Sequence, residues 1–113
     1  LNGSMVLILG VAYKQDIDDY RESPAINVIE EFKKVGSKVD YYDPYVKEYK
    51  HNGNVFHSIE KIDNDIISQY DLVVITTAHT NIDYEMVSKS AKFIFDTKNA
   101  MKNISNRENI ELL

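Results

Sequence analysis

Two basic residues in the segment GVAYKQDIDDYRESPA, residues 10–25, are of the types that bind phosphate groups. Lys14 offers a mobile point charge, and Arg21, seven residues later, offers a planar fork of N–H donors. Three Asp residues lie between them, so a plainer interpretation is that each cation pairs with a neighbouring carboxylate at the surface. Such surface pairs stabilise a protein by only about 0–1 kcal/mol. The segment therefore indicates either an anion site or ordinary surface ion pairs.

The same segment does not follow the established phosphate-loop or calcium-loop patterns. Gly10 is followed by VAYKQ, so the later glycines of a dinucleotide fingerprint and of a P-loop are missing. An EF-hand loop that began at Asp16 would need Gly where Arg21 stands and Glu where Asn27 stands. The sequence gives little support to a metal site.

The elements that must position these residues alternate between strands and helices. MVLILG, residues 5–10, is typical of a strand that is buried in a parallel sheet. Ser23 and Pro24 suit a helix N-cap and first helical residue, and an apolar face predicts a helix that ends at Gly36. Further strands are predicted at 38–43, 54–58, 71–77 and 92–96, and further helices at 59–70 and 83–91. This order predicts one domain of the α/β class with a Rossmann-like, three-layer, doubly wound parallel sheet, followed from residue 99 by a polar, poorly defined tail.

The carboxyl ends of the strands are where such a sheet binds ligands. That edge would bring together residues 10–23, 43–45, 76–81 and 96–99. His79 and Lys98 fall within these segments and so become candidates for ligand contact. A lone His is more often structural, however, and Lys98 could be an ordinary solvated cation.

Composition excludes several classes of protein. Thirteen basic and 18 acidic residues give a net charge of −5, which argues against a nucleic-acid partner. The absence of Cys excludes a disulfide scaffold, a Cys-ligated zinc site and a Cys nucleophile within these residues, and it fits a reducing, cytoplasmic location. No apolar run approaches the ~20 residues of a membrane span, so we expect no membrane partner.

Several segments together resemble the C-terminal, UDP-binding domain of the UDP-glucose/GDP-mannose dehydrogenase family. They are GVAYKQDIDDYRESPA, VDYYDPY at 39–45, DLVVITTAH at 71–79 and FIFDTKN at 93–99. The family pattern is Gly-x-Ala-Tyr/Phe-Lys, acidic residues, Arg-Glu-Ser-Pro, and a strand that ends in Asp-Pro. The resemblance implies that residues 1–4 end an upstream connection, 5–101 form the UDP-binding domain, and 102–113 form a polar tail.

The resemblance also implies a larger enzyme. Family members have an N-terminal NAD-binding domain, a central helical dimerisation region and a nucleophilic Cys upstream of this domain. They oxidise the C6 alcohol of a nucleotide sugar to a carboxylate in two NAD-dependent steps. UDP-sugar and NAD are therefore the expected ligands, with NAD bound mainly by the N-terminal domain. We expect the full-length protein to be a homo-oligomer, and these 113 residues alone to be inactive.

Site residues follow from the same motifs, and none of them is expected to be catalytic. The resemblance implies that Tyr13 and Lys14 contact the UDP-sugar and that Arg21 reaches the NAD pyrophosphate. Lys98 stands where many members have Arg, and it would also contact the UDP-sugar, but without a bidentate pair. Residues 77–79 read Thr-Ala-His where plain UDP-glucose dehydrogenases tend to have Thr-Glu-Trp. This favours a UDP-N-acetylhexosamine as substrate, with UDP-glucose as the alternative.

Two classes of non-enzymatic protein stay open. A receiver-type signalling module would use Asp18 or Asp19, Thr77 and Lys98, but residues 54–58 offer no Asp to accept a phosphoryl group. A purely structural or interaction domain would use the same scaffold and bind no nucleotide.

Overall fold

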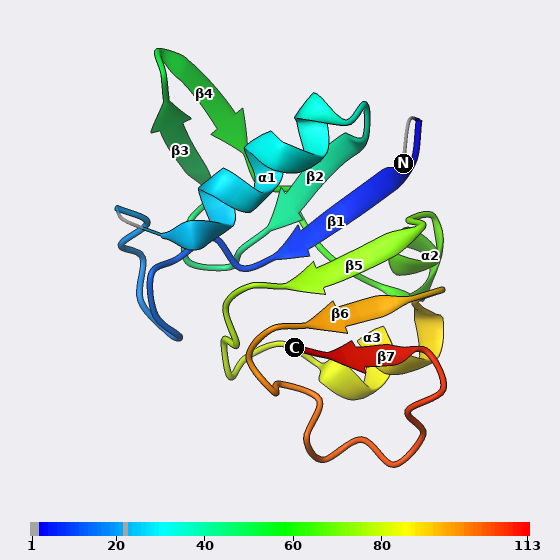
Figure 1. Ribbon diagram of the computed structural model, residues 1–113. Coiled ribbons are helices and arrows are strands. Elements are labelled where there is room, and N and C mark those ends of the chain that lie inside the picture. Colours follow the sequence, from blue (N-terminus) through cyan, green and yellow to red (C-terminus); the bar gives the residue numbers. More distant parts are fainter. Residues whose placement is uncertain (1–2, 22) are drawn as a thin grey trace.

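A five-stranded parallel sheet forms the centre of the protein, as the computed structural model of residues 3–21 and 23–113 shows (Figure 1). The strand order is β2–β1–β5–β6–β7. The bounds are β1 Met5–Leu9, β2 Lys38–Tyr42, β5 Leu72–Ile75, β6 Ile94–Asp96 and β7 Ile110–Leu112. The predicted α/β, Rossmann-like fold is confirmed. Glu22 of the Arg-Glu-Ser-Pro motif lies outside the described residues, as do Leu1 and Asn2 of the predicted upstream connection.

Helices lie on both faces of this sheet. Helix α1 (Pro24–Lys34) covers one face, and α2 (Asn64–Ser68) and α3 (Tyr84–Ser90) cover the other (Figure 1). Alternate residues of β1 therefore enter two different cores, with Val6 and Ile8 on the α1 side and Leu7 and Leu9 on the α2 and α3 side. Burial on both faces explains why β1 is a continuous apolar run. Ser23 caps α1 as predicted, since its hydroxyl accepts a hydrogen bond from the Ala25 N–H at 3.2 Å.

A β-hairpin that was not predicted enlarges the core on the α1 side. Strands β3 (Glu48–His51) and β4 (Asn54–His57) pair antiparallel. Their turn is Asn52-Gly53, in which both residues have positive φ, 51° and 80°; an Asn-Gly pair is a strong hairpin signal. The strand predicted at 54–58 exists, but it belongs to this hairpin and not to the parallel sheet.

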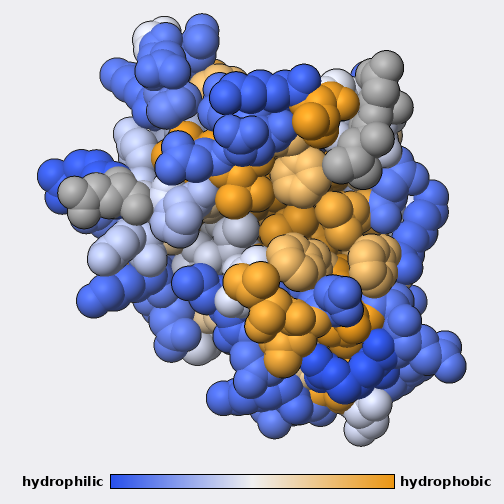
Figure 2. Space-filling view, viewed as in Figure 1, coloured by the Kyte–Doolittle hydropathy of each residue, from blue (hydrophilic) through white to orange (hydrophobic). Residues whose placement is uncertain are grey.

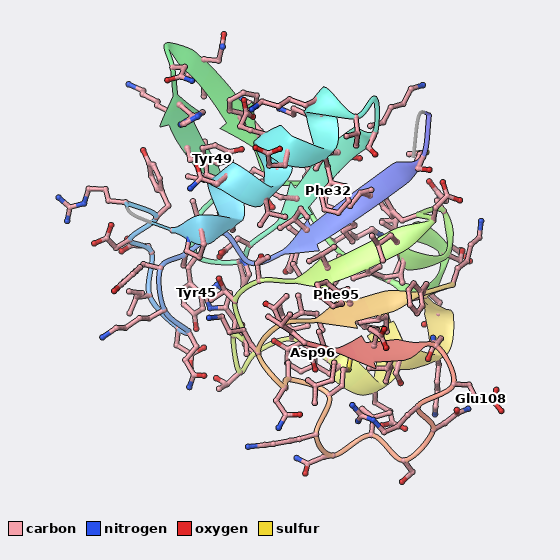
Figure 3. All side chains as sticks on the ribbon, viewed as in Figure 1. Phe32, Tyr45, Tyr49, Phe95, Asp96 and Glu108 are labelled. Carbon is pink, nitrogen blue, oxygen red and sulfur yellow. The ribbon has the colours of Figure 1, made fainter. Side chains whose placement is uncertain are left out.

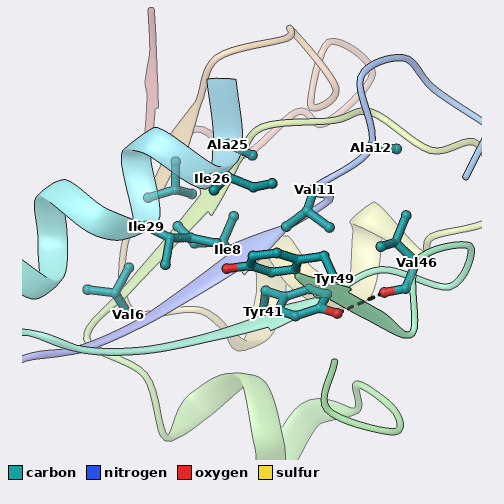
Figure 4. Packing of buried hydrophobic residues seen from close by; sticks show 11 residues of the cluster. Val6, Ile8, Val11, Ala12, Ala25, Ile26, Ile29, Tyr41, Val46 and Tyr49 are labelled. Atoms are coloured by element: carbon teal, nitrogen blue, oxygen red, sulfur yellow. Dashed lines mark hydrogen bonds between the residues drawn. The ribbon is translucent and has the colours of Figure 1, made fainter. Parts of the chain in front are cut away.

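Aromatic side chains join the hairpin to the rest of the core. Tyr49 of β3 packs against Tyr41 of β2, with ring centroids 5.3 Å apart, and stacks on Phe56 at 5.1 Å. The Tyr41 hydroxyl donates to the Val46 carbonyl at 3.0 Å (Figure 4). These contacts fix the chain that follows β2, where the candidate site begins.

Two further elements differ from the sequence-based prediction. The helix expected over 59–70 spans only Asn64–Ser68, because the Asp63 carboxylate accepts from the Ile66 N–H at 2.8 Å and caps the helix there. The tail is better ordered than expected, since β7 pairs in parallel with β6. A three-residue strand is too short for its periodicity to be recognised in a sequence.

The α1 face of the sheet is only partly covered. The connection from β1 to β2 carries α1, whereas α2 and α3 lie on the opposite face, and within the described chain no helix covers β6 and β7 on the α1 side (Figure 1). Leu72 and Phe95 pack toward the α1 side, and Figure 2 shows hydrophobic surface over this area. Phe93 is 44% exposed. This part of the sheet therefore presents apolar side chains at the surface.

Candidate functional site at the carboxyl edge of the sheet

The carboxyl ends of β1 and β5 form the point where the connections of the sheet diverge, which is the usual place for a ligand in this class of fold. The loop after β1 crosses the end of β5 at very short range. Gly10 has φ +90°, and a Cβ built on it would lie 2.5 Å from the Thr77 Cβ. Only glycine suits this backbone and this contact. The path of the loop is thus set at its first residue.

Asp43, at the end of β2, fixes the start of that loop. Its carboxylate is 1% exposed, and Oδ2 accepts from the N–H groups of Val11 at 2.8 Å and Ala12 at 3.1 Å. Oδ1 accepts from the N–H groups of Tyr45 at 2.8 Å and Val46 at 3.1 Å. One side chain therefore organises two loops. The Asp-Pro motif placed Asp43 at this edge, but its role as a buried acceptor was not predicted.

His79 is fully buried between these loops. Its Nε2 lies 2.9 Å from Asp43 Oδ2, and its Nδ1 accepts from the Asp16 N–H at 2.8 Å. Burial acts to raise the pKa of Asp43, but hydrogen bonds from His79 and from the backbone outweigh burial and lower it. The Tyr45 ring packs on the imidazole with centroids 4.8 Å apart. With no exposed surface, His79 is not placed to contact a ligand, so the structure does not support its prediction as a ligand-contacting residue.

Asp16 fastens the middle of the loop to the chain after β5. Its carboxylate accepts from the Thr80 N–H at 2.8 Å and from the Thr80 hydroxyl at 2.9 Å, and these bonds lower the pKa of Asp16. Asp16 has φ +62°, a backbone conformation that is uncommon outside glycine. Thr77 adds a hydrogen bond from its hydroxyl to the Ala12 carbonyl at 2.7 Å. The carboxylate of Asp16 is therefore engaged within the protein and is not the partner of Lys14.

Tyr13 and Lys14 lie on the outer side of this anchored loop. Tyr13 is 49% exposed, and Lys14 is exposed with its Nζ 5.9 Å from the centre of the Tyr13 ring. Among the described residues, Lys14 forms no ion pair. Within the residues that the structure describes, Lys14 is therefore not a partner in a surface ion pair. Its charge faces solvent beside an aromatic ring, which suits an incoming anion.

Arg21 lies farther along the loop, beside the β3–β4 hairpin. Its side chain is 84% exposed, and its guanidinium pairs with Asp19 through two hydrogen bonds of 3.1 Å, which lower the pKa of Asp19. The plainer interpretation, that Arg21 pairs with a neighbouring Asp at the surface, is therefore confirmed for Asp19. Arg21 also borders a hollow of about 370 Å³ that Lys50 and His51 of the hairpin line. This places a second group of basic side chains away from β6.

Lys98 is carried by a second loop of similar construction, after β6. Asp96 lies at the end of β6 (Figure 3). It is fully buried and accepts from the N–H groups of Lys98 at 3.0 Å, Ala100 at 3.1 Å and Met101 at 2.8 Å. Asp96 thus orders the loop after β6 much as Asp43 orders the loop after β1. The Lys98 side chain is exposed. Its role was inferred from a motif, whereas the buried acceptor beneath it was not predicted.

The predicted site residues therefore fall into two groups. Tyr13, Lys14 and Lys98 lie on loops that leave the same edge of the sheet, after β1 and β6, whereas Arg21 lies toward the hairpin (Figure 1). All four side chains are exposed.

Two other kinds of site were searched for within the described residues. They contain no group of three or more His, Cys, Asp or Glu side chains that could hold a metal ion. No helix among them combines the length and the apolar character that crossing a bilayer requires.

Comparison with known proteins extends these observations. Residues 7–103 match the UDP-glucose/GDP-mannose dehydrogenase family, UDP binding domain. The UDP-N-acetyl-D-mannosamine dehydrogenase of Pyrococcus horikoshii is 33% identical over 104 residues, which are 88% of this chain and 22% of that protein. The UDP-N-acetyl-D-glucosamine 6-dehydrogenase of Salmonella typhi is 32% identical over 79 residues, 70% of this chain and 18% of that protein.

Solved structures agree with this relationship. A structure of the UDP-D-ManNAc dehydrogenase from Pyrococcus horikoshii superposes with a TM-score of 0.72 and 28% identity, covering 98% of this chain and 25% of that one. The chain thus spans about a quarter or less of the length of these relatives. The resemblance that the sequence motifs indicated is confirmed: this chain belongs to the UDP-glucose/GDP-mannose dehydrogenase family and contains its UDP-binding domain.

Proposed function

We propose that this chain binds the diphosphate of a UDP-sugar within an NAD-dependent UDP-sugar 6-dehydrogenase. The enzyme would oxidise the C6 alcohol to a carboxylate, with a UDP-N-acetylhexosamine as its substrate. The observation that carries the proposal is the loop after β1, which presents Tyr13 and Lys14 to solvent while Asp43, His79 and Thr80 hold it from beneath.

The diphosphate fits the basic residues of this edge. Lys14 and Lys98 are exposed and sit on loops that buried carboxylates hold in shape, so little ordering remains to be done on binding. A Lys ammonium binds phosphate as a point charge, so Lys in place of Arg at position 98 preserves the attraction but not a bidentate geometry. Tyr13 would contact the same ligand. In this proposal the two Lys residues and Tyr13 bind and orient the UDP part.

Arg21 would serve the second ligand, NAD. Its side chain is 84% exposed on the hairpin side of the loop, where a pyrophosphate brought by another domain could reach it. The segment after β1 lacks a dinucleotide fingerprint, so most NAD contacts would come from the N-terminal domain. When bound, NAD supplies the hydride acceptor for each oxidation step.

An N-acetylated substrate is favoured by the relatives, since two that match 88% and 91% of this chain are named UDP-N-acetyl-D-mannosamine dehydrogenase. The buried position of His79 means that this residue would not read the sugar directly. UDP-glucose is the alternative. We further propose that the functional unit is residues 5–101, that the full-length enzyme is a cytoplasmic homo-oligomer, and that the isolated domain is inactive.

Titration of the chain with UDP tests the central part of this proposal. We expect weak binding, with shifts of the amide resonances around Lys14 and Lys98 in a ¹H–¹⁵N spectrum. Lys14→Ala should weaken UDP binding by about ten- to a hundred-fold, because a hydrogen bond to a charged group contributes about 1.5–3 kcal/mol. Lys38→Ala is the matched control, since Lys38 is exposed at the amino end of β2, the opposite edge of the sheet.

The full-length enzyme tests the division of labour. Arg21→Ala should raise the KM for NAD, whereas Lys14→Ala should raise the KM for the UDP-sugar. No resonance shift at millimolar UDP would favour a purely structural domain, and an unchanged KM for NAD would leave Arg21 as a surface ion-pair partner of Asp19. A higher kcat/KM for UDP-glucose than for every N-acetylated sugar would refute the substrate assignment alone.

A further inference from the structure

A fully buried imidazole connects the parts of the chain that shape the candidate site. His79 Nε2 lies 2.9 Å from Asp43 at the end of β2, and His79 Nδ1 accepts from the Asp16 N–H at 2.8 Å. The His79 carbonyl accepts from the Tyr84 hydroxyl of α3 at 2.7 Å. The Tyr45 ring packs against the imidazole at an interplanar angle of 54°. His79 thus touches the loops after β1 and β2 and the start of α3 at once.

The two ring nitrogens have different roles that the geometry fixes. A backbone N–H can only donate, so Nδ1 must carry a lone pair toward Asp16. The proton of the neutral ring then sits on Nε2 and points at the Asp43 carboxylate. We call the continuous connection Asp43–His79–Asp16 the His79 bridge.

The His79 bridge ends two residues from Lys14. Asp16 adopts φ +62°, and its carboxylate is bound by Thr80 on the other side. The Tyr13 N–H donates to the Asp19 carbonyl at 2.6 Å and closes the loop around these residues. The hydrogen bond from the Asp16 N–H to His79 therefore holds the loop on its inner side, and Tyr13 and Lys14 are left facing solvent.

From this arrangement we propose that His79 is a positioning residue for UDP binding, acting on Lys14 through the Asp16 backbone. The inference rests on the proposed function. His79 contacts no ligand; its Nδ1 sets the conformation of the loop, while its Nε2 joins the loop to the carboxylate that also binds the N–H groups of residues 11 and 12. The bond to Asp16 and the bond to Asp43 therefore have separable effects on ligand affinity.

Two substitutions separate the two nitrogens. In His79→Asn the side-chain amide is as far from the backbone as Nδ1 of the histidine, so its oxygen can still accept from the Asp16 N–H, while the bond to Asp43 is lost. In His79→Gln the amide reaches the level of Nε2, so it can still donate to Asp43 while the bond to Asp16 is lost. We expect His79→Gln to weaken UDP binding by roughly three- to ten-fold, as for one lost neutral hydrogen bond, and His79→Asn to weaken it by less than about three-fold.

Thermal unfolding supplies the control for general damage. Both His79 variants should be less stable than the unmodified chain, and Tyr70→Phe should also lose stability, because the Tyr70 hydroxyl donates to Asp40 at 2.7 Å. Tyr70 and Asp40 are not in the UDP-facing loops, so Tyr70→Phe should bind UDP as the unmodified chain does. A merely structural role for His79 predicts that UDP affinity follows melting temperature across all three variants.

Nitrogen chemical shifts of His79 test the bridge without any ligand. We expect a protonated Nε2 and an unprotonated Nδ1 at neutral pH, with the Asp16 amide resonance displaced in His79→Gln and retained in His79→Asn. A protonated Nδ1, or equal UDP affinities for the two variants in a chain that binds UDP, would overturn the positioning role alone. A chain that binds no UDP would instead overturn the proposed function, and the two failures are therefore distinguishable.

Discussion

Asp43→Asn offers the sharpest test of how the site is held. The buried carboxylate of Asp43 accepts from four backbone N–H groups and from the His79 Nε2–H; four of these bonds are buried, and the one from the Tyr45 N–H is partly buried. Asparagine has almost the same shape but only one acceptor atom. If its oxygen faces the three donors now bound to Oδ2, its NH₂ group must face the N–H groups of Tyr45 and Val46. A buried donor, the Val46 N–H, and a partly buried one, the Tyr45 N–H, then lose their acceptor.

The expected loss of stability follows from those two donors. A buried N–H left without a partner costs about 1–3 kcal/mol, so the free energy of unfolding should fall by about 2–6 kcal/mol. A domain of this size has a total of only about 5–15 kcal/mol. Each kcal/mol lowers the Tm by about 4 °C, so we expect a decrease of at least about 8 °C.

Urea unfolding at neutral pH measures this effect, and Asp40→Asn is its control. Asp40 lies three residues earlier in β2 and is exposed, and its carboxylate accepts the Tyr70 hydroxyl, a bond that an amide oxygen can keep. We expect Asp40→Asn to change stability by less than about 1 kcal/mol, as for most surface substitutions. Equal losses in the two variants would show that Asp43 does not organise the loops.

The pH dependence of stability tests the lowered pKa of Asp43. The pKa of folded Asp43 is lowered, so its contribution is fully present above its unfolded pKa of about 4 and is lost as the pH falls through the folded pKa. The difference in unfolding free energy between the unmodified chain and Asp43→Asn should therefore shrink below about pH 4. A difference that stays constant into that range would contradict the lowered pKa.

Three further outcomes are expected. Gly10→Ala should lower the unfolding free energy by more than about 2 kcal/mol, because the new Cβ would clash with Thr77. Gly53 also has positive φ but has no atom within 4 Å of such a Cβ, so Gly53→Ala should lower the unfolding free energy by only about 1 kcal/mol. A similar loss at both positions in chemical denaturation would contradict the close approach of Gly10 to Thr77. Ser23→Ala should remove the cap of α1 and lower stability by about 1 kcal/mol, while Ser68→Ala, at an exposed hydroxyl, should change it by less than half as much in the same assay. The chain by itself should produce no NADH from NAD and any UDP-sugar when the absorbance of NADH is followed, and clear turnover would refute its assignment as one domain of a larger enzyme.

Much of the fold and the family can be obtained from the sequence alone. The apolar run of β1 and the Ser23-Pro24 start of α1 are local signals, because burial and capping depend on residues that are close in sequence. The motif from Gly10 to Ala25 identified the family because its residue types and spacing are specific. The alternation of strands and helices, together with the handedness of their connections, was enough to predict the class of fold, and it also predicts that ligands bind at the carboxyl edge of the sheet.

Only the tertiary structure decided what supports that edge. His79 follows β5, Asp16 follows β1 and Asp43 follows β2. Because β1 lies directly between β2 and β5 in the sheet, the segments after these three strands meet at one edge, and His79 comes within hydrogen-bond distance of Asp16 and Asp43. The hairpin of β3 and β4 has a local signal in its Asn52-Gly53 turn, but its packing on Tyr41 through Tyr49 was likewise decided by the tertiary structure. The hydrogen bonds from Val11 to Asp43, from Asp16 to His79 and between His79 and Asp43 join residues 30 or more positions apart. No periodicity or spacing in the sequence records them, because the energy of a buried hydrogen bond depends on which partner the fold brings to it.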